Sequence, residues 1–205
     1  MFRITPIVKH FIIINVIMFA LTLLAENFML EKFALFYFNS PFFKPYQLIS
    51  YIFMHGGFMH ILFNMYSLYI FGSVLESVWG GKKFFIYYMV TGIGAALFHL
   101  FITYLRIESG VLDPYLASII PMVGASGAIY GLLLAYGVLF PNNVLTLFFP
   151  PVSLKAKYMV FVFGGLEFLL GVGGSGDGVA HFAHLGGMLF GFVILMIWKR
   201  GNKLY

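Results

Sequence analysis

The sequence predicts an all-α, polytopic membrane protein. Of its 205 residues, 61% are hydrophobic and only 9% are charged, whereas soluble domains have about 45–50% apolar and about 25% charged residues. Long apolar runs recur along the chain, separated by short polar segments. The chain contains no Cys, which excludes disulfides, thiol catalysis and cysteine metal sites. The net charge of +5 is scattered between apolar runs rather than gathered in one patch, so we expect no nucleic-acid partner.

We expect a single domain, residues 1–205, with six membrane spans. The first apolar run follows Arg3, Lys9 and His10, like a signal peptide, but no small-residue cleavage site follows it and further spans do, so we expect it to be retained. Residues 26–55 are too polar to span a membrane and too apolar for a solvated linker, and they predict a long external loop at the lipid headgroups. The spans are expected near 8–25, 57–78, 84–104, 123–140, 155–171 and 180–198.

The distribution of basic residues predicts the orientation. With six spans, nine of the twelve Lys and Arg residues fall on the side of the termini: Arg3, Lys9, Lys82, Lys83, Lys155, Lys157, Lys199, Arg200 and Lys203. Because cytoplasmic loops carry the excess of Lys and Arg, both termini are expected to be cytoplasmic, in a bacterial plasma membrane. Trp79 and Trp198 fall at the same predicted boundary, where indole rings favour the interface.

Polar residues occur near the outer ends of three predicted spans: His60 in span 2, Ser126 in span 4 and His184 in span 6. The 15 residues from Ser126 to Phe140 would cover about 22 Å as a helix, less than the hydrocarbon core of about 30 Å. A helix that begins near Ser126 would therefore place the serine roughly 8–10 Å below the outer surface. Irregular backbone at that depth, around 120–124, is tolerated where it is buried in protein or lines a water-filled cavity.

Spans 4 and 6 each have two glycines four residues apart, a pattern that lets helix backbones approach closely. These pairs are Gly127 with Gly131 and Gly187 with Gly191. If the two faces pack together, Ser126 and His184 could come within hydrogen-bond reach. His184 would then act as general base toward the serine and as general acid toward the leaving amine.

Three further residues fit the same chemistry. His60 and Asn64 are four apart and share one helical face. Their side chains could stabilise an oxyanion together with the backbone N–H of Ser126 at a helix N-terminus. Tyr130 lies one turn after the serine and could pack against the ring of His184.

Structural explanations exist for each of these features alone. Glycine faces commonly serve helix packing, a serine in a membrane helix usually bonds to its own backbone, and an intramembrane histidine can be structural or part of a proton path. It is their coincidence at one depth on three spans that favours a serine hydrolase. We expect Glu76 to hold the end of span 2 to the next turn, and Glu167 to reach the interface or a neighbouring side chain.

These motifs, in this order and topology, resemble the rhomboid family of intramembrane serine proteases in its minimal six-span prokaryotic form. The motifs are His60-x-x-x-Asn64, Gly124-x-Ser126-Gly127 and Ala183-His184-x-x-Gly187-x-x-x-Gly191. Rhomboids often carry a Trp-Arg pair in the first loop, and residues 26–50 contain neither residue.

The resemblance implies roles for these residues. Ser126 would be the nucleophile and His184 the base, without a third acidic member. His60 and Asn64 would line the oxyanion hole, and Tyr130 would orient His184 from beneath. Span 5 and the loop 172–178 would form the substrate entrance, and the site would open to the external side.

The expected function is therefore the hydrolysis of peptide bonds in or near transmembrane segments of other membrane proteins, within the lipid bilayer and without metal or cofactor. One alternative is a non-catalytic rhomboid-like protein that binds membrane client helices; such proteins typically lack the serine or histidine. Another is a metal enzyme, suggested by His55, His60, His181 and His184, but no His-Glu-x-x-His motif occurs and Asp177 is the only carboxylate expected nearby. A transporter would show paired broken helices in two related halves, which are not apparent. Substrate identity and oligomeric state are left open.

Overall fold

A computed structural model describes residues 4–147, 151–174, 179–202 and 204, and it is mainly helical. Five helical segments are long and apolar enough to cross a membrane, so the chain is an integral multi-pass membrane protein. They are α1 (Pro6–Leu24), the continuous run of α4 (Phe58–Ser67), η2 (Leu68–Gly72) and α5 (Ser73–Trp79), then α6 (Gly81–Glu108), α9 (Ala156–Gly173) and α10 (His181–Arg200).

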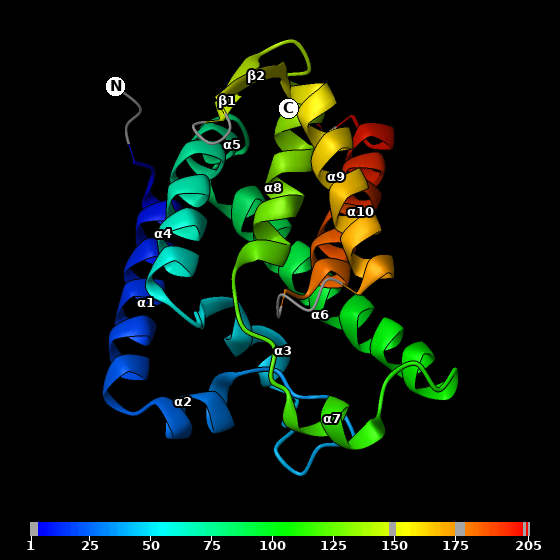
Figure 1. The fold of residues 1–205 in the computed structure, drawn as a ribbon. Coiled ribbons are helices and arrows are strands. Elements are labelled where there is room, and N and C mark those ends of the chain that lie inside the picture. Colours follow the sequence, from blue (N-terminus) through cyan, green and yellow to red (C-terminus); the bar gives the residue numbers. More distant parts are fainter. Residues whose placement is uncertain (1–3, 148–150, 175–178, 203, 205) are drawn as a thin grey trace.

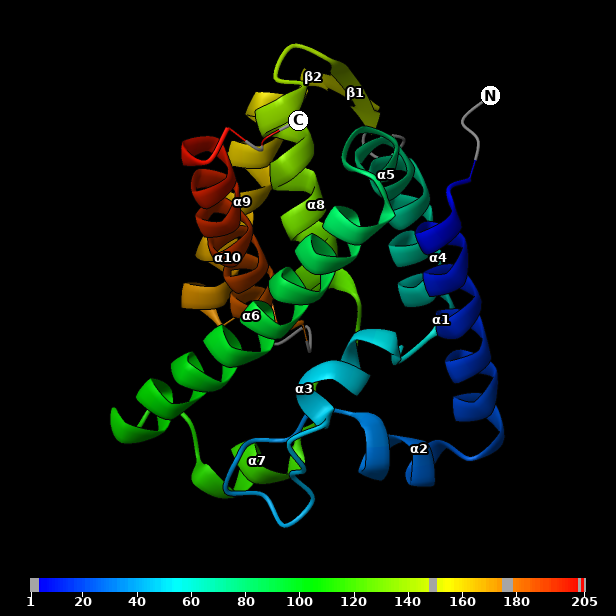
Figure 2. The same cartoon turned by 180° about the vertical axis from the view of Figure 1, so that it is seen from behind.

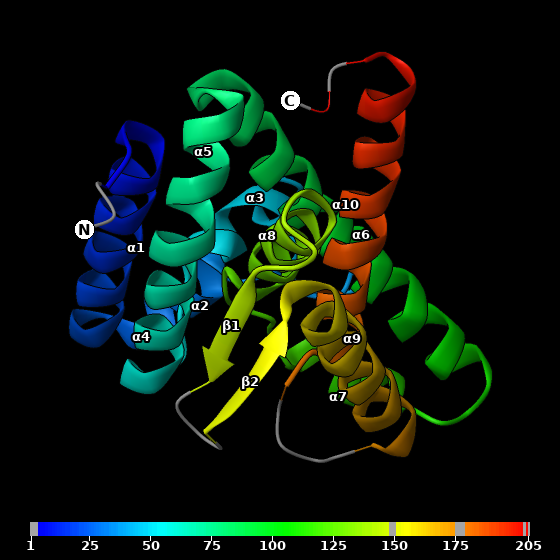
Figure 3. The same cartoon turned by 90° about the horizontal axis from the view of Figure 1, so that it is seen from above.

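The remaining apolar helix, α8 (Ser126–Leu139), has only 14 residues. Each of the six predicted spans overlaps one of these helices, but α8 is too short to cross a bilayer of ordinary thickness by itself. Seen from above, α8 lies in the middle of the bundle, surrounded by α4 and α5, α6, α9 and α10 (Figure 3). Ten of its 14 residues are buried. The shortest of these six apolar helical segments is therefore also the central one.

The two ends of the bundle differ in structure. The start of α1 and the end of α10 lie at one end, together with a hairpin of β1 (Val144–Leu147) and β2 (Val152–Lys155) (Figures 1 and 2). These antiparallel strands pair Val144 with Lys155 in the connection between α8 and α9, so the chain is not purely α-helical. The opposite end carries α2 (Glu26–Phe33), α3 (Gln47–Ser50) and α7 (Pro114–Ile119).

Glu76 joins α5 to the start of α1. Its carboxylate accepts hydrogen bonds from the backbone N–H groups of Ile7 and Val8, both at 2.9 Å, and from the hydroxyl of Thr5. The first N–H groups of a helix have no partner within the helix, and a negative charge there is favourable. Glu76 thus caps a helix that precedes it by about 70 residues, rather than fixing the turn that follows it.

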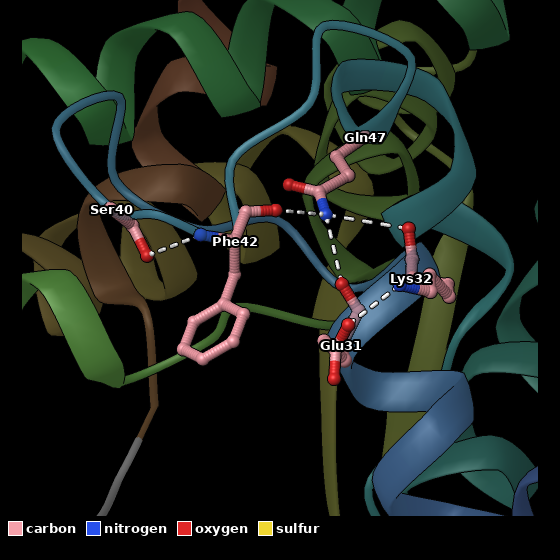
Figure 4. A network of polar contacts seen from close by, with 5 residues as sticks. All are labelled: Glu31, Lys32, Ser40, Phe42 and Gln47. Carbon is pink, nitrogen blue, oxygen red and sulfur yellow. Dashed lines mark hydrogen bonds and ion pairs between the residues drawn. The ribbon is translucent and has the colours of Figure 1, made fainter.

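The first loop, expected to be interfacial, contains α2, α3 and the short 3₁₀ helix η1 (Tyr51–Phe53). Gln47, which is fully buried, holds it together (Figure 4). Its amide nitrogen donates to the backbone carbonyls of Glu31, Lys32 and Phe42 at 3.0–3.3 Å. A buried amide that bonds three carbonyls fixes a loop that has little regular structure.

The segment before α8 is irregular, as the sequence predicted. Met122 pairs with Leu35 of the first loop in an isolated bridge, with backbone hydrogen bonds of 2.8 and 2.9 Å. The N–H of Gly124 donates to the carbonyl of Tyr51 at 3.0 Å. The first loop therefore supplies hydrogen-bond partners for the irregular backbone that precedes Ser126.

Candidate active site

Ser126 is the first residue of α8. Gly124, two residues earlier, has a φ of +130°, which L side chains rarely adopt. A Cβ atom at this position would also lie 2.7 Å from Nε2 of His60 and 3.7 Å from Oγ of Ser126. Only glycine fits here, and its missing side chain leaves room between the histidine and the serine.

The serine and His184 are in direct contact. Nε2 of His184 lies 2.7 Å from Oγ of Ser126, a hydrogen bond between residues 58 apart in the sequence. His184 is in the first turn of α10 and is only 7% exposed. A buried imidazole hydrogen-bonded to a serine hydroxyl is the arrangement of a nucleophile with its general base.

The close approach of α8 and α10 makes this contact possible. A Cβ on Gly187 would lie 1.8 Å from the backbone oxygen of Gly127, so only glycine permits the crossing. The second glycine of each pair packs elsewhere. Gly131 faces Thr91, and Gly191 faces the hydroxyl of Tyr87, both on α6. The two glycine faces thus meet at one point and then separate around α6.

Tyr130 lies against the ring of His184. The ring centroids are 4.3 Å apart and the planes differ by 6°, which is a parallel stack. Such a stack limits tilting of the imidazole about the line of its bond to Ser126.

A cavity of about 1560 Å³ opens beside this pair. Ser126 and His184 line it together with His60 and Asn64, which the sequence had grouped with them. The amide nitrogen of Asn64 donates to the carbonyl of His60 at 2.9 Å, and an amide has a second N–H that could donate to a ligand in the cavity. Of the expected entrance loop 172–178, residues 175–178 lie outside the described residues. Leu170 and Gly171 of α9 do line the cavity.

Glu167 reaches neighbouring side chains, one of the two alternatives expected from the sequence. It lies six residues before the end of α9 but faces inward, toward α8 and α10, and is 7% exposed. Its Oε2 atom lies 2.9 Å from Nδ1 of His184 and 2.6 Å from Nδ1 of His181, and its Oε1 atom accepts a hydrogen bond from the hydroxyl of Tyr130.

The expectation that no acidic residue accompanies the serine and histidine is therefore wrong for this chain. The sequence held one signal: a carboxylate inside a membrane helix needs partners there. The partners themselves, 14 and 17 residues later, could not be read from the spacing because a loop intervenes.

Glu167, His181 and His184 are also the described residues that could hold a metal ion, since their ligand atoms lie within 4.8 Å of one another. The carboxylate near the histidines is thus Glu167, whereas Asp177 lies outside the described residues. Tyr130 already occupies the other carboxylate oxygen, and Nε2 of His184 bonds Ser126. These partners favour a hydrogen-bonded network over an ion site.

His55 lies next to the site without joining this network. Its ring centroid is 5.0 Å from that of His60, and the side chain is 1% exposed. Burial, and then the neighbouring imidazole of His60, lower the pKa of His55 to about 3. His55 is therefore neutral at physiological pH and packs behind the cavity.

Comparisons with known proteins identify the family of this chain. Residues 42–201 match the family model of the rhomboid domain. The mitochondrial Rhomboid protein 1 of Saccharomyces cerevisiae is 33% identical over 157 residues, which are 71% of this chain and 39% of the yeast protein. The Rhomboid protease AarA of Providencia stuartii is 31% identical over 144 residues, covering 69% of this chain and 51% of the relative. The Rhomboid protease GluP of Bacillus subtilis is 27% identical over 147 residues, covering 72% and 25%.

The chain thus spans between a quarter and about half of the length of these relatives. Two of them are named as proteases, so protease activity is supported at the level of the family. The matched region contains the central helix, Ser126, His60, His184 and the glycines of α10. The chain belongs to the rhomboid family.

Proposed function

We propose that this protein is a serine endopeptidase that cleaves peptide bonds in or near the transmembrane segments of other membrane proteins. The observation that carries the proposal is the 2.7 Å hydrogen bond between Nε2 of His184 and Oγ of Ser126, at the wall of a large cavity within a membrane bundle. The names of the related proteases support the same activity.

The geometry suggests the following chemistry. Nε2 of His184 takes the proton as Oγ of Ser126 attacks the scissile carbonyl carbon, and the carbonyl oxygen becomes an oxyanion. His184 then gives that proton to the leaving amine, and an acyl-enzyme remains on the serine. Water enters, loses its proton to the same imidazole and releases the new carboxyl end, which restores Ser126.

Three groups could stabilise the oxyanion. The backbone N–H of Ser126 lies at the N-terminus of α8, where such groups lack helical partners. His60 and Asn64 face the same cavity. Removing one such donor typically costs about 10²–10³ in turnover.

The membrane setting defines the substrate class. The cavity is lined by apolar residues of α4, η2 and α9, among them Phe63, Ile70 and Phe163, and it suits an apolar chain entering from the bilayer. A helical substrate must unwind locally before a serine can attack its carbonyl, because that carbonyl is hydrogen-bonded within the helix. We therefore expect substrates that carry helix-weakening residues near the cut.

The test is fluorophosphonate labelling of the purified protein in detergent, comparing wild type with Ser126→Ala and His184→Ala. We expect labelling of the wild type only, unchanged by a chelator because no metal takes part. Absence of labelling in folded wild-type protein, while an active rhomboid protease labels in parallel, would instead support a non-catalytic protein that binds membrane clients.

A further inference from the structure

We propose that Glu167 is a positioning residue for catalysis. It holds the proton of neutral His184 on Nδ1, keeps Nε2 free to accept from Ser126, and stabilises the imidazolium that forms during the reaction. This inference rests on the serine protease activity proposed above.

The contacts of the carboxylate support an ionised glutamate. Oε1 accepts from the hydroxyl of Tyr130, while Oε2 faces the Nδ1 atoms of both His181 and His184. A proton on Oε2 could be donated to only one imidazole, and the other would have to donate to a neutral hydroxyl oxygen, a weaker acceptor than a carboxylate. With the carboxylate ionised, all three neighbours can donate to it, and its two oxygens have enough lone pairs to accept.

The charge balance follows the reaction. In the resting site a single negative charge lies among neutral donors, which is costly inside a membrane protein. When His184 takes the serine proton, the new positive charge lies beside Glu167, at the 2.9 Å separation between Nδ1 and Oε2. The pair is then neutral overall, so the carboxylate stabilises the transition state more than the resting state.

The contact between His184 and Glu167 can strengthen during the reaction. Nδ1 of His184 has no well-aligned hydrogen bond among the described residues, although Oε2 lies within reach. Catalytic hydrogen bonds are often poorly aligned without substrate and tighten as charge develops.

Glu167 is held in place from two helices. Tyr130 donates from α8, while its ring stacks on His184. His181 lies three residues before His184 on the same face of α10, with its ring perpendicular to that of His184. The cavity-lining residues of the described chain include Tyr130, His181 and His184 but not Glu167. Its expected influence is therefore on turnover through His184, and not on substrate binding.

The test compares Glu167→Gln with Glu76→Gln, a second buried glutamate that lies away from the site. A glutamine can turn its NH₂ group toward Nδ1, which favours the tautomer with the proton on Nε2, where Ser126 then meets a donor. For Glu167→Gln we expect kcat for a transmembrane reporter peptide to fall about 10²–10⁴-fold. KM should stay within about threefold, since the residue does not line the cavity.

The second readout is independent of activity. ¹⁵N NMR of histidine-labelled protein, with His184 assigned through the His184→Ala variant, distinguishes the two neutral tautomers. We expect the Nδ1–H form in wild type and in Glu76→Gln, and the Nε2–H form in Glu167→Gln. Wild-type turnover and an unchanged tautomer in Glu167→Gln would overturn the inference while leaving the protease proposal intact.

A lack of labelling in the wild type itself would instead contradict the protease proposal. The tautomer of His184 would still show whether Glu167 holds the proton on Nδ1. If Glu167→Gln does not fold, Glu167→Asp replaces it, because it keeps the charge but withdraws the carboxylate by one methylene. Glu167→Asp should lower kcat at constant KM; wild-type kcat in this variant would contradict the inference.

Discussion

Glu76 and Glu167 are both buried glutamates in membrane helices, at 5% and 7% exposure, and for each the described part of the chain gives three polar neighbours. The neighbours differ in kind. Two of the three groups at Glu76 are the backbone N–H groups of Ile7 and Val8 at the start of α1. Two of the three groups at Glu167 are imidazoles, one of which contacts the serine.

Residue type and burial therefore do not distinguish a structural carboxylate from one that serves chemistry; the partners do. A carboxylate at a helix N-terminus stabilises the folded protein, because its negative charge is favourable there. A carboxylate beside an imidazole stabilises the protonated, positively charged form of that imidazole. The comparison predicts that changes at the two sites affect different measured quantities.

The largest expected effect is the removal of the base. His184→Ala should lower peptide cleavage by about 10⁴-fold or more, with little change in the midpoint of unfolding by SDS or heat. The matched change at the other site, Thr5→Ala, should leave cleavage unchanged. A His184→Ala protein that still cleaves at a tenth of the wild-type rate would mean that the imidazole is not the base.

Glu76→Gln should show the opposite behaviour. The amide cannot replace both oxygens as acceptors, so a buried N–H of Ile7 or Val8 loses its partner, and the favourable charge at the α1 N-terminus is lost. We expect a loss of about 2–3 kcal/mol in unfolding free energy, with cleavage per folded molecule unchanged. A loss of cleavage without a loss of stability would break the comparison.

Acidification should lower the free energy of unfolding through His55, which lies beside the site. Its pKa is about 3 in the folded protein, below the ordinary value near 6.5, so the unfolded chain binds the proton first and stability falls as pH drops below about 6.5. Between pH 7 and pH 5, His55→Gln should lose about 2 kcal/mol less unfolding free energy than wild type. His10→Gln serves as the control for replacing an exposed histidine. Identical losses in wild type and His55→Gln would contradict the assignment.

The smallest effects come from single hydroxyl groups. Tyr130→Phe removes the donor to Glu167 but keeps the ring that stacks on His184. We expect a decrease in kcat of about tenfold, equal to about 1.4 kcal/mol, at unchanged KM. Thr5→Val removes the corresponding donor to Glu76 and should cost about 1 kcal/mol of stability without changing kcat. Equal effects of both variants on kcat would show that the two carboxylates are not functionally different.

The sequence predicted those features that depend on hydrophobicity and residue size along a single segment. Apolar runs located every helix of the bundle, and the prediction of a short helix that begins near Ser126 is confirmed. The glycine at 187 predicted close helix contact because only a missing Cβ permits it. The span count of six and the cytoplasmic location of the termini stay predictions.

Features that depend on distant partners could not be predicted. Glu167 meets His181 and His184 only because α9 and α10 return side by side, and Glu76 caps α1 only because α5 ends beside it. The hairpin of β1 and β2 arises in a short, weakly patterned connection. In each case the contact joins two segments, and no periodic pattern in the sequence indicates that these segments meet.

The most direct test of the account is peptide mass spectrometry after fluorophosphonate treatment of the protein in lipid nanodiscs. Oγ of Ser126 lies 2.7 Å from Nε2 of His184, its proposed base. We predict one phosphonate adduct, on the peptide and at the residue Ser126, and none in His184→Ala. An adduct on a different hydroxyl, or none on folded wild-type protein alongside a labelled rhomboid protease, would contradict the central claim that Ser126 is an activated nucleophile.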